Sequence, residues 1–259
     1  MSDKVTAPRI RAMKGRERIV SITAYDAPMA KLADEAGVDF ILVGDSVGDV
    51  VLGYPTTIPV TLEEILHHTR AVRRGVSRAL LVADMPFGTY QPSVEVAMES
   101  AVALMKAGAE AVKVEGASES ISHMVKAGIP VMGHVGLTPQ SVFAFGGHKV
   151  QGKGEDADVI LKAAQYVQEQ GAFAVVLELV PAALAARITK CLDIPTIGIG
   201  AGAQCDGQIQ VLHDVLGLSE RVFRHAKPFM DGRGEVQKAL KQYTDEVRKG
   251  SFPGESNSF

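Results

Sequence analysis

The chain has 259 residues and a formal net charge of −3, and 46% of its residues are hydrophobic and 22% are charged. This length and composition suit one compact domain, 1–259, of the size of an α/β barrel, which typically has about 250 residues. The lack of a basic block excludes the electrostatic surface of a typical nucleic-acid-binding protein. The lack of an apolar run near ~20 residues excludes a membrane-spanning helix.

Predicted strands and helices alternate along the chain. The strands cover 19–26, about 39–45, segments that end at Asp84 and at Glu115, 130–137, a segment that ends at Glu178, and 194–200. The helices cover 27–36, 61–74, 93–108, 118–127, 156–170, a segment opened by Pro181, and 234–249. Residues 1–18 are expected to form a polar surface arm or a short helix, and 250–259 an extended tail. An eighth strand is expected within 209–229, where the pattern does not separate strand from helix.

Alternating strand–helix units predict parallel strands joined by right-handed crossovers. About eight units close into a (β/α)₈ barrel. The alternative, a doubly wound open sheet, is weaker because the glycine-rich fingerprint after the first strand is missing. Two connections, 47–59 and 138–154, are long for a barrel, and the second could be a lid or an oligomer contact.

The apolar runs of four predicted strands stop at an acid. The acids are Asp45 (followed by Ser46), Asp84, Glu115 and Glu178. Runs rich in Val, Ile and Leu indicate strands buried on both faces, where an ionised carboxylate is costly without a partner. Four acids in equivalent positions therefore suggest one shared partner, and a hard divalent cation is our first hypothesis.

Two basic candidates accompany these acids at the predicted strand ends. Lys113 is two residues before Glu115, so both side chains point to one side of their strand. His134 is near the end of the fifth strand. Acids within predicted helices are expected to be solvated instead: Asp34, Glu35, Glu63, Glu64, Glu95, Glu99 and Glu169.

Each candidate also has a structural explanation. A strand-end acid can cap the next helix, Lys113 can be an ion-pair partner, Ser46 can belong to a turn, and His134 can be a core histidine. Capping does not explain why four acids gather at the barrel end where active sites lie. Oxygen ligands suit Mg²⁺, whereas zinc is disfavoured because the adjacent His67 and His68 do not face a common point. Such an ion could chelate a 2-oxo acid and stabilise an enolate, with a carboxylate as the base.

In combination, nine segments resemble the ketopantoate hydroxymethyltransferase (3-methyl-2-oxobutanoate hydroxymethyltransferase) family, over about residues 10–255. The segments are Thr23–Asp26, Leu42–Ser46, Thr57–Thr61, Ala83–Phe87, Val112–Gly116, Gly133–Gln140, Gly146–Gly152, Leu177–Pro181 and Gly198–Gly202. Two departures, His148 where Tyr is frequent and Leu179 where Cys is frequent, do not involve the acids. Residues 203–230 match less clearly.

The resemblance implies a barrel of the phosphoenolpyruvate/pyruvate-like superfamily and a Mg²⁺-dependent transferase with one ion per subunit. It would move a hydroxymethyl group from 5,10-methylenetetrahydrofolate to 3-methyl-2-oxobutanoate, in pantothenate and coenzyme A biosynthesis, through a Mg-stabilised enolate. By position, it implies a metal site of Asp45, Asp84 and Glu115, and Glu178 as the proton acceptor. Asp45, Ser46, Asp84, Lys113 and His134 would contact the oxo acid. It also implies a homo-oligomer, commonly a decamer, in the cytoplasm.

Two competing hypotheses remain. The first is a Mg²⁺-dependent lyase or mutase on the same barrel, which often uses a reactive cysteine on a mobile loop. Here Cys191 is near a helix end and Cys205 is in a glycine-rich loop, so neither is persuasive. The second is a non-catalytic barrel that binds a metabolite or a partner. The two cysteines make no disulfide framework, and Met1–Pro8 lacks the apolar core of a secretory signal, so a reducing, cytoplasmic location without membrane partners is expected.

Overall fold

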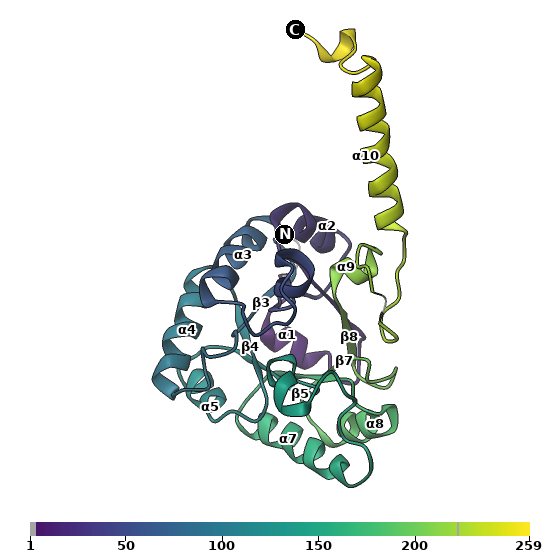
Figure 1. The fold of residues 1–259 in the computed structure, drawn as a ribbon. Helices are drawn as coiled ribbons and strands as arrows, with labels where there is room; N and C mark the ends of the chain where they lie inside the picture. Colours follow the sequence, from purple (N-terminus) through teal and green to yellow (C-terminus); the bar gives the residue numbers. More distant parts are fainter. Residues whose placement is uncertain (1–3, 222) are drawn as a thin grey trace. The chain divides into compact units, whose positions relative to one another are not determined.

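The computed structural model describes residues 4–221 and 223–259, and its contacts divide the chain into two compact units, Met1–Val211 and Leu212–Phe259. In the first unit, eight parallel strands form a closed barrel in chain order, surrounded by helices (Figure 1). The strands are β1 Ile19–Thr23, β2 Phe40–Val43, β3 Leu80–Asp84, β4 Ala111–Glu115, β5 Val131–Gly136, β6 Ala174–Glu178, β7 Thr196–Ile199 and β8 Gly207–Gln210. The helices are α1 Ala7–Ala12, α2 Ala27–Glu35, α3 Leu62–Gly75, α4 Val94–Lys106, α5 Ser120–Lys126, α6 Val142–Phe145, α7 Ala157–Glu169 and α8 Ala182–Cys191.

The barrel closes between its first and last strands. Ile19 of β1 is in register with Gly207 of β8, and Ile22 with Gln210. This pairing confirms the predicted (β/α)₈ barrel, because an open sheet would leave both edges unpaired. The long connections contain short helical turns: Gly48–Leu52 in the first, and Pro139–Ser141, α6 and Gly154–Asp156 in or next to the second.

The eighth strand is displaced from its expected place. It begins at Gly207, before the predicted segment 209–229, and ends at Gln210. Its sequence, Gly-Gln-Ile-Gln, has one large apolar side chain, Ile209, which points into the buried interior. A strand of four residues with two glutamines carries too weak a hydrophobic pattern to be located from sequence.

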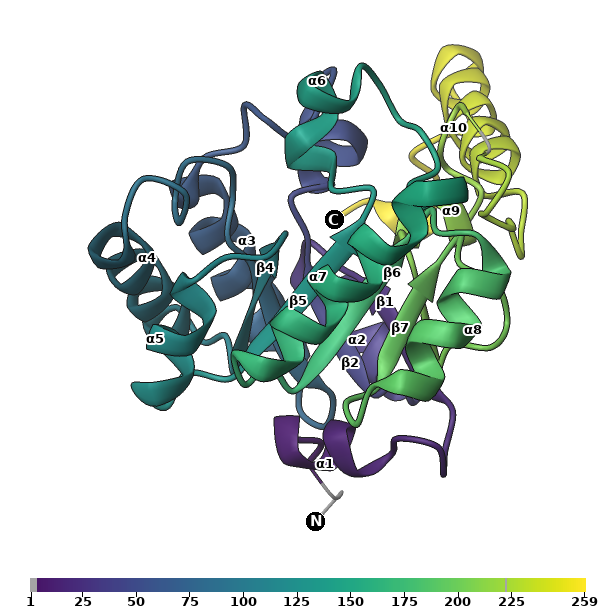
Figure 2. The same ribbon diagram turned by 90° about the horizontal axis from the view of Figure 1, so that it is seen from below.

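The amino-terminal segment is more than the polar surface arm that the sequence predicted. Helix α1 lies at one end of the barrel, opposite α6 (Figure 2). Ile10 is fully buried and Met13 nearly so, and both belong to the apolar cluster inside the barrel with Phe40 and Met132. The segment therefore closes the amino-terminal end of the barrel with apolar side chains.

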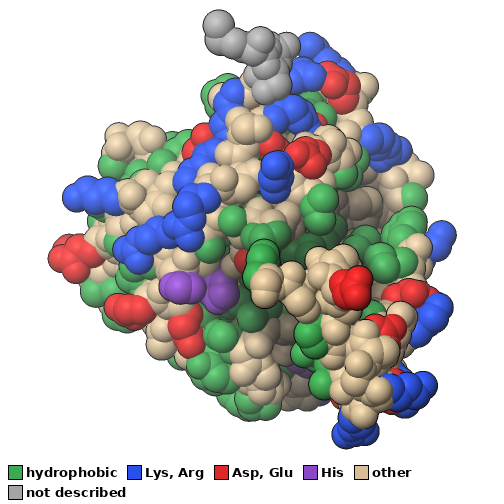
Figure 3. Space-filling view, turned by 90° about the horizontal axis from the view of Figure 1, so that it is seen from above, with side chains coloured by type: hydrophobic (Ala, Val, Ile, Leu, Met, Phe, Trp, Pro, Cys, Tyr) green, Lys and Arg blue, Asp and Glu red, His purple; other side chains and the backbone are tan. Residues whose placement is uncertain are grey.

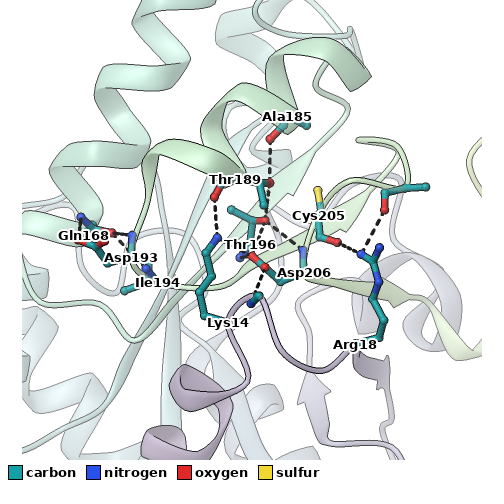
Figure 4. A network of polar contacts seen from close by, with 12 residues as sticks. Lys14, Arg18, Gln168, Ala185, Thr189, Asp193, Ile194, Thr196, Cys205 and Asp206 are labelled. Atoms are coloured by element: carbon teal, nitrogen blue, oxygen red, sulfur yellow. Dashed lines mark hydrogen bonds and ion pairs between the residues drawn. The ribbon is translucent and has the colours of Figure 1, made fainter.

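A buried acid fixes this closure. Asp206, which precedes β8, accepts hydrogen bonds from Lys14 Nζ at 2.7 Å, the Gly15 N–H at 3.2 Å and the Thr196 N–H at 2.9 Å. Figure 4 shows Lys14 pointing into this cluster from the amino-terminal segment, with its ammonium also donating to the Thr189 carbonyl. Asp206 thus joins the segment before β1 to β7 and β8, and the network belongs to the stability of this face.

Asp34 was predicted to be solvated, and this prediction is wrong. The residue is 7% exposed, and its carboxylate accepts hydrogen bonds from the backbone N–H groups of Ser77, Arg78 and Ala79 and from the Ser77 hydroxyl. Burial raises the pKa of Asp34, but these hydrogen bonds outweigh it and lower the pKa to about 2. The side chain ties α2 to the segment that enters β3.

Asp34→Asn should lower the free energy of unfolding by about 2 kcal/mol at pH 7, because the amide loses the charge that these donors stabilise. The folded-state pKa lies below the unfolded value of about 4. The contribution is therefore complete above pH 4 and is lost as the pH falls towards 2. Urea unfolding at pH 7 and pH 3 measures this difference. Glu35→Gln is the matched control, since Glu35 is exposed and 3.8 Å from Lys31, and it should change stability by less than about 0.5 kcal/mol. Equal effects of both variants would contradict the prediction.

The second unit contains α9 Leu212–Val215, α10 Gly232–Lys249 and a 3₁₀ turn at Glu255–Asn257. Helix α10 begins two residues before its predicted start and ends where it was predicted to end. Its N-cap is Asp231, whose side chain accepts from the Gly234 N–H. Within the described residues, no helix has the length and apolar character needed to cross a bilayer. Figure 3 shows one face of the molecule, on which both acidic and basic side chains are exposed. The prediction of a single domain over 1–259 stays a prediction.

Candidate active site at the carboxyl ends of the strands

The four predicted acids do lie at one rim of the barrel. Asp84, Glu115 and Glu178 are the last residues of β3, β4 and β6, and Asp45 follows β2 by two residues. Because all eight strands are parallel, their carboxyl ends meet at the same rim, where barrel active sites lie. The sequence pattern therefore located these acids correctly.

Lys113, Asp84 and Asp45 form a continuous buried chain of contacts. The Lys113 ammonium lies 2.7 Å from Asp84 Oδ1, and Asp84 Oδ2 accepts the Asp45 N–H at 2.9 Å. A Cβ at Gly44 would come within 2.9 Å of Ser46 Oγ and 3.4 Å of Asp84 Oδ2. Glycine at position 44 therefore allows the backbone after β2 to approach the acid of β3 closely.

His134 lies between two of the acids. Its Nδ1 is 3.4 Å from Glu115 Oε1, and its Nε2 is 3.3 Å from Glu178 Oε2. Burial and the nearby Lys113 lower the pKa of His134, but Glu115 and Glu178 raise it to about 9. Lys113 Nζ also lies 3.3 Å from Nδ1, and it can donate to this nitrogen only when Nδ1 carries no proton. The distances from His134 to Glu115 and Glu178 are longer than those of short hydrogen bonds.

The acids differ in their access to solvent. The side chains of Asp84 and Glu115 are 3% exposed, whereas that of Glu178 is 17% exposed. Glu178 is followed by Leu179, whose backbone is left-handed with φ 45°. Such a conformation costs about 1–2 kcal/mol in a residue other than glycine and is typical of functional sites. The backbone of Leu179 is held by the Ile199 carbonyl and the Gln151 N–H, so the position of Glu178 is fixed from both sides.

Ser46 has a partner that the sequence did not predict. The Tyr25 hydroxyl, just after β1, lies 2.8 Å from Ser46 Oγ, and the Tyr25 carbonyl is 2.6 Å from His68 Nδ1. Burial raises the pKa of Tyr25, so its hydroxyl stays neutral. Gln140, in the turn after β5, is a second unpredicted residue of the site. Tyr25 and Gln140 both follow a barrel strand, and both belong to segments that carry the family resemblance. This position after a strand is the sequence signal from which they could have been predicted.

Negative charge is in excess at this rim. Four carboxylates meet Lys113 and His134, so two negative charges remain when all six groups are ionised. Burial raises the pKa of Asp45 well above its ordinary value, and the carboxylates of Asp84 and Glu115 raise it further. Within the described residues, the buried Glu115 Oε1 has no hydrogen-bond partner. Buried oxygen donors with unbalanced negative charge fit a hard divalent cation.

The arrangement is not a closed metal cage. Among the residues that the structure describes, no three His, Cys, Asp or Glu side chains converge as a ready-made metal-binding group. Mg²⁺ does not require one, because it keeps several waters and binds proteins through one or two carboxylates together with its substrate. The donor set at the strand ends therefore fits Mg²⁺ better than it fits zinc, which prefers a closed set of nitrogen and sulfur ligands.

Neither cysteine lies at the carboxyl end of a barrel strand, where the four acids lie. Cys205 is buried and precedes β8, so it belongs to the amino ends of the strands, and its carbonyl accepts from Arg18 (Figure 4). Cys191 is exposed at the last position of α8. Neither position supports the hypothesis of a lyase with a reactive cysteine at the active site.

Comparison with known proteins gives a consistent result. The family described as ketopantoate hydroxymethyltransferase matches residues 4–255. The 3-methyl-2-oxobutanoate hydroxymethyltransferase of Syntrophus aciditrophicus is 54% identical over 99% of this chain and 97% of its own, and that of Aeropyrum pernix is 52% identical over 98% and 94%. The structure of 2,3-dimethylmalate lyase, a PEP mutase/isocitrate lyase superfamily member, matches with a TM-score of 0.62 at 14% identity, over 96% of this chain and 89% of that one. This likeness confirms the barrel fold that the sequence predicted.

Proposed function

Since the chain belongs to the ketopantoate hydroxymethyltransferase family, we propose that it transfers a hydroxymethyl group from 5,10-methylenetetrahydrofolate to 3-methyl-2-oxobutanoate. The products are 2-dehydropantoate and tetrahydrofolate, and one water supplies the hydroxyl oxygen. The observation that carries this proposal is the buried group of four acids, one lysine and one histidine at the carboxyl rim of the barrel. Relatives that share half of the sequence over nearly its whole length carry the name of this activity.

We propose Mg²⁺ as the cation, held by Asp45, Asp84 and Glu115. The gathering of buried carboxylates, which raises the pKa of Asp45, and the lack, among the described residues, of a hydrogen-bond donor for the buried Glu115 Oε1 support this assignment. When bound, Mg²⁺ would act as a Lewis acid towards the oxygens of the oxo acid. Homo-oligomer formation, and a decamer in particular, stays a prediction.

The remaining residues bind the oxo acid. The Lys113 ammonium supplies positive charge beside Asp84, where an anionic substrate would otherwise meet only carboxylates. The Ser46 hydroxyl is oriented by Tyr25 and offers a hydrogen-bonding group at the same rim. His134 faces Glu178, with Nε2 3.3 Å from Oε2, so it holds that carboxylate in place.

Glu178 is the proposed proton acceptor. Its side chain is 17% exposed at the end of β6, whereas the other three acids of the site are almost fully buried. Its carboxylate would take the proton from C3 of the oxo acid. The electron pair left on C3 then forms the new bond to the methylene carbon as one of the two C–N bonds of that carbon breaks. Hydrolysis of the second C–N bond puts the oxygen of water on the methylene carbon and releases tetrahydrofolate, whose two nitrogens take up the proton from C3 and one proton from water.

The proposal is tested by exchange of the C3 proton of 3-methyl-2-oxobutanoate in D₂O, followed by NMR without folate. Exchange that requires Mg²⁺ and stops with a chelator is the expected result, because deprotonation precedes carbon–carbon bond formation. Absence of exchange, with Mg²⁺ and the oxo acid shown to bind by calorimetry, would favour the lyase hypothesis. Absence of any binding would favour a non-catalytic barrel.

A further inference from the structure

Gln140 connects the acids of the site through a buried amide. The residue is 5% exposed and lies in the 3₁₀ turn η2, Pro139–Ser141, directly after β5. Its side-chain Nε2 donates to Asp45 Oδ2 at 2.9 Å and to the Met85 carbonyl at 3.0 Å. Its backbone N–H donates to Glu115 Oε2 at 3.0 Å. One residue thus contacts two of the proposed metal-site acids by two independent groups.

The other end of the amide is held as firmly. Oε1 of Gln140 accepts from the Tyr90 hydroxyl at 2.8 Å and from Gln91 Nε2 at 3.1 Å. A glutamine amide has two N–H donors and two acceptor sites, and all four are used here. The Tyr90 and Gln91 donors and the Asp45 and Met85 acceptors also fix which end of the amide is nitrogen. Any rotation of the side chain would leave buried polar groups unpaired, which is costly.

The identity of the residue follows from these partners. Glutamate at position 140 could keep the bonds from Tyr90 and Gln91, but it would have no N–H for Asp45 and would add another carboxylate to the site. An apolar residue of the same length would remove every side-chain bond. The backbone N–H bond to Glu115 would survive both changes, and it is the only one of these bonds that would survive the apolar change.

The contacts join loops that are distant in sequence. Asp45 follows β2, Met85 and Tyr90 follow β3, Glu115 ends β4, and Gln140 follows β5. We propose that Gln140 is a positioning residue, which holds Asp45 and Glu115 at a fixed separation at the rim so that they bind the cation and the oxo acid together. This inference rests on the proposed function for its assay. Groups that orient metal-binding carboxylates in this way typically account for 10–100-fold in metal affinity or activity.

The test compares substitutions at the two ends of the amide. Gln140→Met keeps the length and volume and removes the donor to Asp45. We expect it to raise the KM for 3-methyl-2-oxobutanoate and the Kd for Mn²⁺, measured by EPR, by about tenfold or more. The KM for 5,10-methylenetetrahydrofolate should change by less than about twofold, because the lost bonds serve the cation and oxo-acid half of the site. Gln140→Glu, which keeps the Tyr90 and Gln91 bonds and so the local fold, should raise the KM for the anionic oxo acid further.

Tyr90→Phe is the matched control, because it removes a hydrogen bond to the same amide and a longer contact with the Glu115 carbonyl but leaves the Asp45 bond intact. A purely structural role for Gln140 predicts that in both variants KM and the Mn²⁺ Kd change only in proportion to the loss in Tm. That outcome, or a KM and a Mn²⁺ Kd within twofold of the wild type in Gln140→Met, would overturn the inference. A wild-type protein that binds Mn²⁺ but neither exchanges the C3 proton nor turns over would refute the proposed function alone, and the Mn²⁺ Kd values would still decide the role of Gln140.

Discussion

Glu178→Gln should abolish exchange of the C3 proton of 3-methyl-2-oxobutanoate while it leaves the affinity for that oxo acid within about threefold of the wild type. The amide keeps the shape of the side chain but cannot accept a proton, and general-base catalysis typically contributes 10²–10⁴-fold. Binding should survive because Lys113 and Ser46, the proposed substrate contacts, are untouched. NMR exchange in D₂O measures the first effect, and calorimetry measures the second.

The matched control is Glu99→Gln, the same chemical change on the exposed surface of α4. It should alter neither exchange nor binding. Exchange that persists in Glu178→Gln at the wild-type rate would show that another group takes the proton. Loss of both exchange and binding would assign Glu178 to the binding of the oxo acid instead, since an interaction used only in deprotonation leaves the ground-state complex intact.

The acids of the site could be predicted because their signal is local. An apolar run such as Leu80–Ala83 before Asp84 stops at the residue that reaches the rim, and parallel strands bring such positions together. Lys113 followed from the two-residue repeat of a strand, and its contact with Asp84 on the neighbouring strand confirms that it faces the site. Periodicity and one fold rule were sufficient for these residues.

The missed features depend on partners far along the chain. The carboxylate of Asp34 accepts hydrogen bonds from N–H groups more than 40 positions away in the sequence. The amide of Gln140 donates to Asp45, which is 95 positions away. In α1, the inward Ile10 is flanked by Arg9 and Arg11, so composition indicates a polar arm although one face fills the barrel. A single sequence states what each residue can bind, but not which distant group the fold brings to it.

Lys113→Met should destabilise the protein by about 3–5 kcal/mol at neutral pH, because it removes the cation from a buried ion pair. The ammonium lies 2.7 Å from Asp84, and both side chains are at most 5% exposed. Burial lowers the pKa of Lys113, but Asp84, Glu115 and Asp45 outweigh this effect and raise it, so the lysine is charged. Thermal unfolding measures the loss, which corresponds to a decrease in Tm on the order of 10 °C for a domain of this size.

The double variant Lys113→Met with Asp84→Asn separates charge from packing. If the loss in Lys113→Met comes from an unpaired buried carboxylate, removing that charge should return a large part of the stability, and the double variant should be more stable than Lys113→Met alone. Additive losses would instead mean that the lysine stem matters chiefly as packing.

The effect of Mg²⁺ on stability is a second test of the charge explanation. Mg²⁺ bound among the acids should stabilise Lys113→Met more than the wild type, since only the variant lacks a cation beside Asp84. Neither variant should transfer the hydroxymethyl group at an appreciable rate, because restoring charge balance by neutralising Asp84 does not restore the positive charge that the oxo acid needs.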